Sequence, residues 1–196
     1  MSNKKLKLST ERIKRTGYFQ SVNVSTPTVP GQPDQIDVVY DVTEMPAGQL
    51  VAGLGYSQDD GVAFNASVSQ DNFLGTGKKM SLALQTQSAS QLYQVAYTNP
   101  YYLVDGVSRG FNISHRSTDY ADLGSSSYNI NDTVLGVNFG IPLSEFNRFS
   151  FDTKMHFTEF DAGTLAPLEV RDWETKEGNN YTNVETSLYW SRDTRD

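Results

Sequence analysis

Four polar residues in the last third of the chain, Asp152, Lys154, His156 and Asp161, are of the types found in hydrolase sites. A histidine near carboxylates can act as a general base. Asp152, Lys154 and His156, however, alternate with phenylalanine and methionine residues. Charged residues on the polar face of such a strand also line a wet lumen. We prefer the lumen interpretation and expect no catalytic residue and no enzymatic activity.

A second stretch, Gly75–Lys78 with sequence GTGK, is similar to part of a phosphate-binding loop. A complete loop has the pattern GxxxxGK[ST] and opens a helix, and neither feature is present. Asp59 and Asp60 lack the spacing of a calcium-binding loop, and His115 falls on the apolar face of its segment. We therefore interpret GTGK as a hairpin turn and expect no metal ion and no cofactor.

Charge is unevenly distributed along the chain, whose formal net charge is -7. The residues after Arg15 have an excess of acidic side chains, and such a surface does not bind the phosphate backbone of nucleic acid. Nucleic acid is therefore not an expected partner. The chain has no cysteine, which excludes disulfides and thiolate metal sites. It also has no apolar run near the roughly 20 residues that a membrane-spanning helix needs. Within residues 1–15, Glu11 alone opposes the bases Lys4, Lys5, Lys7, Arg12, Lys14 and Arg15.

Residues 1–47 are predicted to form a small α+β unit. Ser9 is a suitable N-cap for a short helix, and Gly17 is a suitable C-terminal stop. Two alternating stretches, Ser21–Ser25 and Gln35–Thr43, are joined by turn-rich sequence and predict a strand pair. A unit of this size is marginal as an independent core, so we expect it to be the end of a domain that begins before Met1.

From residue 48 the sequence alternates between apolar and polar residues in about eight segments. Spanning β-strands need only about 9 to 11 residues and alternate in this way, so the mean hydropathy stays low. The pattern predicts an antiparallel transmembrane β-barrel wall, with a soluble β-sandwich as the alternative. The segments are Gln49–Tyr56, Val62–Ser69, Met80–Gln85, Tyr93–Thr98, Phe111–Arg116, Leu135–Ile141, Phe149–Phe157 and Val184–Trp190.

The connections between these segments also alternate in kind. Every second connection carries an aromatic residue and turn residues, namely residues 71–79, 99–108 and 142–147. The longest polar connections, residues 119–132 and 161–182, belong to the other set. This asymmetry is typical of membrane barrels with tight turns on one side and long external loops on the other.

The first segment is unusual in its glycines. In GQLVAGLGYS, residues 48–57, the even-numbered positions from Leu50 to Tyr56 share an apolar face, and the odd-numbered positions from Val51 to Ser57 share a face of small residues. Glycines inside a strand weaken its packing or allow a close backbone approach. For Gly53 and Gly55 both explanations remain open at this point.

Three blocks carry a resemblance to a known family. They are Arg12–Tyr40 (RIKRTGYFQSVNVSTPTVPGQPDQIDVVY), Gly61–Gly77 (GVAFNASVSQDNFLGTG) and Thr98–Ser108 (TNPYYLVDGVS). Together they resemble the Omp85 family of outer-membrane β-barrel assembly factors. The first block is similar to the second helix and last two strands of the POTRA repeat nearest the barrel. The other two are similar to barrel strands 1 to 4 and their periplasmic turns.

The resemblance implies a mainly β fold, with a partial POTRA domain at residues 1–47 and the N-terminal half of a 16-stranded barrel at residues 48–196. It implies the outer membrane of a Gram-negative bacterium, with the N-terminal part in the periplasm. Earlier POTRA repeats and the remaining half of the barrel are not represented in the sequence. We expect this piece to need that half, a partner chain, a lipid bilayer or detergent.

The function that the resemblance implies is folding and insertion of nascent outer-membrane proteins. Its lateral-gate strand would comprise Gln49, Leu50, Val51, Ala52, Gly53, Leu54, Gly55 and Tyr56, which would template substrate strands. A BamD-like lipoprotein would contact Arg12, Lys14 and Arg15. The periplasmic turns would include Leu74, Gly75, Thr76, Gly77, Asn99, Pro100 and Tyr101. The alternative is a passive pore or adhesin-like barrel that acts through its external loops.

Overall fold

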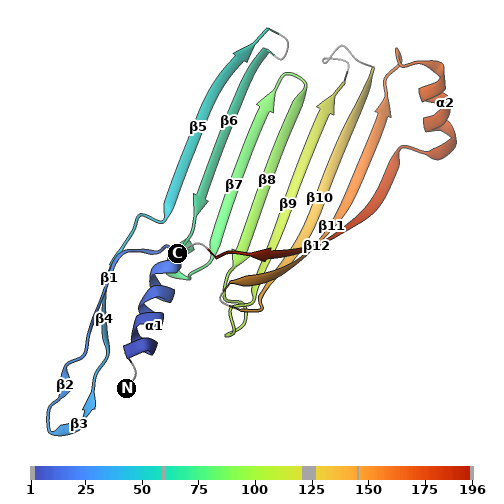
Figure 1. Cartoon of the computed structure of the whole chain (residues 1–196). Coiled ribbons are helices and arrows are strands. Elements are labelled where there is room, and N and C mark those ends of the chain that lie inside the picture. The colour runs from blue at the N-terminus through green and yellow to red at the C-terminus, as the bar shows by residue number, and fades with distance from the viewer. Residues whose placement is uncertain (1–2, 59–60, 121–126, 145, 195–196) are drawn as a thin grey trace. The chain divides into compact units, whose positions relative to one another are not determined.

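The alternating sequence after Ala47 folds into one antiparallel sheet, whereas the residues before it form a helix and short strands (Figure 1). The computed structural model describes residues 3–58, 61–120, 127–144 and 146–194, so Asp59 and Asp60 lie outside the described residues. The chain divides into two units, Met1–Ala47 and Gly48–Asp196. In the described part, no helix is both long and apolar enough to cross a membrane.

The first unit begins with helix α1 (Asn3–Arg15). The prediction that Ser9 caps this helix is wrong, because the helix starts earlier and Ser9 lies inside it. The lysines and leucines before Ser9 are good helix formers, and the Thr10 hydroxyl donates to the Leu6 carbonyl 3.0 Å away within the helix. The predicted stop is confirmed. Gly17 has φ +73°, and its N–H donates to the Lys14 carbonyl at 3.2 Å.

The predicted strand pair of this unit forms with a shorter second strand. β1 (Phe19–Ser25) pairs antiparallel with β4 (Val39–Glu44). The connection contains a small ladder of β2 (Thr28–Val29) and β3 (Gln32–Ile36). α1 packs beside β1, and Val22 of β1 is buried.

The second unit is an eight-stranded meander in which each strand pairs with its neighbours in sequence. The eight segments predicted from alternation all lie within its strands. Helix α2 (Leu168–Glu177) follows β11, and a 3-10 turn, η1 (Phe73–Gly75), follows β6. The strands are β5 (Gly48–Ser57), β6 (Gly61–Gln70), β7 (Lys79–Gln87), β8 (Ser90–Asn99), β9 (Ser108–Asp119), β10 (Tyr128–Pro142), β11 (Asn147–Ala162) and β12 (Asn180–Arg192).

The register brings one apolar residue from every strand into a single row across the sheet. We name this set the apolar row. Each member lies directly opposite the next, and every one is exposed. A soluble sandwich would bury such a row against a second sheet, but no second sheet covers it among the described residues. The row is Leu50, Val68, Leu82, Val95, Ile113, Leu135, Met155 and Val184.

A charge placed in the apolar row should therefore destabilise the sheet in a membrane. In a full-length protein that contains this segment, we expect Leu82→Lys to lower the free energy of unfolding from lipid vesicles by about 2–4 kcal/mol. Ala83→Lys, one residue along on the polar face, should change it by less than about 1 kcal/mol. Urea titration measures both values. Equal losses for the two variants would contradict the assignment of faces.

Candidate functional site

Strand β5 forms one edge of the sheet. It pairs with β6 over its whole length, from Gly48 opposite Gln70 to Ser57 opposite Gly61. Its other edge has no partner strand among the described residues. Unpaired N–H and C=O groups on such an edge can bind another extended strand. All eight predicted gate residues therefore lie on one strand with an open edge.

The two faces of β5 differ in what surrounds them. On the apolar face, the Leu54 side chain is 80% exposed. On the polar face, a Cβ added to Gly53 would lie 2.5 Å from Oδ1 of Asn65. A Cβ added to Gly55 would meet only the Cβ of Ala63, at an ordinary 3.9 Å. The two glycines are thus not equivalent, because close packing accounts for Gly53 and not for Gly55.

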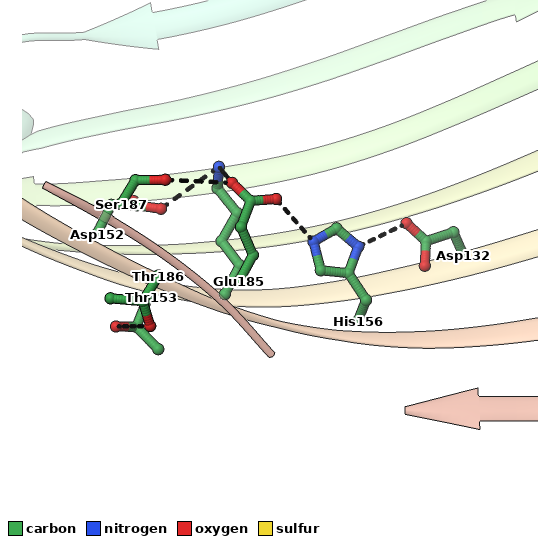
Figure 2. A network of polar contacts seen from close by, with 8 residues as sticks. Asp132, Asp152, Thr153, His156, Glu185, Thr186 and Ser187 are labelled. Atoms are coloured by element: carbon green, nitrogen blue, oxygen red, sulfur yellow. Dashed lines mark hydrogen bonds and ion pairs between the residues drawn. The ribbon is translucent and has the colours of Figure 1, made fainter. Parts of the chain in front are cut away.

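The charged residues of the polar face form a network across β10, β11 and β12, which we name the polar network (Figure 2). His156 lies between two carboxylates. Its Nδ1 is 3.1 Å from Oδ2 of Asp132, and its Nε2 is 3.6 Å from Oε2 of Glu185. Lys154 Nζ lies 3.4 Å from Asp152 and 3.6 Å from Glu185. Acids and bases are thus interleaved along the wall.

The polar network includes three of the four residues first considered for hydrolysis. Asp161 is not among them, because an odd-numbered residue of β11 lies on the opposite face from His156. Among the described residues, two hydroxyls contact this network: Thr158 donates to Asp132 at 2.8 Å, and Ser187 donates to Glu185 at 3.4 Å. His156 thus lies between two carboxylates, an arrangement that also fits a residue lining a lumen. Asp132 and Glu185 could not be predicted as contacts of His156, because those contacts depend on the register between strands.

The GTGK stretch is a turn between β6 and β7, as predicted. The Gly77 N–H donates to Oδ1 of Asn72 at 2.7 Å, and the Phe73 N–H donates to the Lys78 carbonyl at 2.8 Å. Leu74 has φ +52°, and Gly75 and Gly77 also have positive φ. The N–H groups of Gly75, Thr76 and Gly77 thus all donate within the turn.

The turn between β8 and β9 contains the other predicted turn residues. The Tyr101 N–H donates to Oδ1 of Asn99 at 3.1 Å, across Pro100. The Arg109 guanidinium lies 3.8 Å from the centre of the Tyr102 ring. This turn and the β6–β7 turn lie at the same end of the sheet (Figure 1). Arg12, Lys14 and Arg15 belong to the other unit, where they are exposed in the last part of α1.

Helix α2 lies in the long connection that was expected to be an external loop, and an aromatic cluster anchors it. The Trp173 ring stacks on Tyr181 at 5.6 Å and meets Phe160 edge-on at 5.5 Å. Phe160 in turn contacts Tyr128 at 5.2 Å, and the Glu174 carboxylate accepts the Ala162 N–H at 3.3 Å. Pro167 before the helix and Gly178 after it are boundary signals that could have predicted it.

Comparisons with known proteins agree on one family. Residues 72–196 match the Omp85 superfamily domain. The outer membrane protein assembly factor BamA of Neisseria meningitidis is 30% identical over 176 residues, which are 89% of this chain and 22% of that protein. BamA of Nitratidesulfovibrio vulgaris is 29% identical over 194 residues, 98% of this chain and 23% of that protein. The chain thus spans less than a quarter of these relatives.

A solved structure shows the same likeness in three dimensions. The crystal structure of BamA from Haemophilus ducreyi lacking POTRA domains 1–3 matches with a TM-score of 0.74 at 25% sequence identity. The match covers 97% of this chain and 38% of that chain.

The geometry of the polar network predicts a modest effect on stability. Asp132→Ala removes the acceptor of two hydrogen bonds at a half-buried site, so we expect the free energy of unfolding to fall by about 1 kcal/mol. The matched control is Asp161→Ala on the exposed opposite face, which should change it by less than about 0.5 kcal/mol. Denaturant titration in detergent compares the two. A larger loss for Asp161→Ala would show that the network does not tie the strands together.

Proposed function

The chain belongs to the Omp85 superfamily, and we propose that it is part of a BamA-type factor that folds and inserts β-barrel proteins into the bacterial outer membrane. Residues 1–47 are the end of the POTRA domain nearest the barrel and lie in the periplasm. Residues 48–196 are the N-terminal half of the barrel, and the remaining half comes from the longer protein. The names and lengths of the relatives support this assignment.

The observation that carries the proposal is the open edge of β5. An incoming strand pairs with this edge by β-augmentation, so main-chain hydrogen bonds, and not side chains, bind the substrate strand. The substrate then pairs its own backbone and moves its apolar face from water into lipid, which drives insertion without nucleotide hydrolysis. The exposed apolar row supports a sheet that contacts lipid with this face.

Partners follow from the same arrangement. Nascent outer-membrane proteins contact Gln49–Tyr56, and the bilayer contacts the apolar row. A BamD-like lipoprotein contacts the exposed bases Arg12, Lys14 and Arg15 at the end of α1. The turns at Leu74–Gly77 and Asn99–Tyr101 face the periplasm, where their internal hydrogen bonds keep them short.

A disulfide across the gate tests the proposal. Gly55 is the better site for the cysteine, because a side chain there meets no close neighbour, whereas Asn65 fills the space at Gly53. Gly55→Cys is paired with a cysteine on the strand that closes the barrel in the full-length protein. Oxidation should stop insertion of a substrate barrel into vesicles, and reduction should restore it.

The control for the disulfide is a second crosslink within the sheet. Ser67→Cys and Ala83→Cys lie directly opposite each other on β6 and β7, and neither is on the gate strand itself. Oxidation of this pair should leave insertion unchanged. Insertion that continues with the gate fully crosslinked would refute the lateral-gate mechanism.

The hydrolase alternative makes a different prediction for His156. If the polar network only lines the lumen, His156→Ala should retain at least half of the insertion rate per folded molecule, at a cost of about 1 kcal/mol in stability. The folded fraction is measured by heat-modifiable electrophoretic mobility. A loss of a hundredfold or more at a normal folded fraction would instead indicate catalysis by His156.

A further inference from the structure

The side chain of Asn65 on β6 lies across Gly53 on the gate strand. A Cβ built on Gly53 would be 2.5 Å from Oδ1, 3.2 Å from Cγ and 3.3 Å from Nδ2 of Asn65. The amide group as a whole therefore occupies the place of the missing side chain. The two residues are direct partners in the register, so this contact joins the edge strand to the next strand.

Space, and not backbone conformation, explains why residue 53 is glycine. Gly53 is not among the glycines with positive φ, so alanine could adopt its backbone conformation without strain. The atoms nearest to such a Cβ belong to the Asn65 amide, the end of a side chain, which would have to move aside for alanine. Gly55 provides the comparison on the same face of the same strand, because a Cβ there has an ordinary contact.

The same pairing of asparagine over glycine occurs twice more in the sheet, between β9 and β10. Asn138 lies over Gly110, and Asn112 lies over Gly136; both are direct register partners. Strands β9 and β10 each pair with a neighbouring strand on both sides, so two sets of backbone hydrogen bonds hold each of them in place. β5 is held from one side only among the described residues. Of these three pairs, the one between Asn65 and Gly53 involves the strand proposed as the gate.

We infer that Asn65 is a positioning residue for the lateral gate, an inference that rests on the gate role proposed above. Its amide, which lies against Gly53 with Oδ1 nearest, holds β5 in one orientation about its own axis. The orientation of the edge N–H and C=O groups is then set before a substrate strand arrives. Preorganisation of this kind favours binding because less freedom is lost on association.

The test compares four variants in a full-length protein that contains this segment, with insertion into vesicles measured per folded molecule. We expect Gly53→Ala, which displaces the amide, to lower the rate about fivefold, as overpacking of a close contact does. Gly55→Ala should cause a smaller loss. Asn65→Asp, which keeps the shape of the side chain, should retain the rate. Asn65→Ala, which removes the amide and leaves Gly53 unchanged, should also lower the rate.

The matched control away from the gate is Gly136→Ala, which displaces Asn112 in the same manner. It should lower the free energy of unfolding and leave the insertion rate per folded molecule unchanged. An equal loss of rate for Gly136→Ala and Gly53→Ala would overturn the inference, and so would a neutral Gly53→Ala. If the oxidised Gly55→Cys pair also fails to block insertion, the gate mechanism itself is wrong. If that pair blocks insertion while Gly53→Ala is neutral, only the role of Asn65 is wrong.

Discussion

Backbone N–H and C=O groups inside a lipid bilayer must pair within protein, because hydrocarbon offers them no partner. The strands from β6 to β11 meet this demand on both sides, since each has two neighbours in the sheet. β5 and β12 meet it on one side only among the described residues. Among the described strands, the backbone groups that can still pair with a further strand are therefore those at these two edges.

The polar face of the sheet differs between the side of β5 and the side of β10 to β12. The row that starts at Gly53 runs through Asn65, Gln85 and Leu92 before it reaches the charged pair Arg116 and Asp132. The ion pairs of the polar network lie farther along, on β10 to β12. Among the described residues, no ion pair of the polar network involves β5.

Alternation alone predicted the strands, because a period of two determines which residues face lipid. Leu135 and Met155 were assigned to the apolar face for this reason, and the structure confirms it. Contacts between strands were not predictable, because they depend on register as well as on face. This is why Asp132 and Glu185 were missed as neighbours of His156, and Asn65 as the neighbour of Gly53. Ser9 was assigned as a cap because local capping chemistry ignored the good helix formers before it.

Strand length changes along the sheet, from 10, 10, 9 and 10 residues in β5 to β8 to 15 and 16 in β10 and β11. The short strands are at the lower limit of the roughly 9–11 residues that a tilted strand needs to span a bilayer. A sheet whose strands are shorter than the bilayer is thick produces hydrophobic mismatch, which the bilayer relieves by thinning locally. By this argument, lipid beside the short strands β5 to β8 would be thinner than lipid beside β10 and β11.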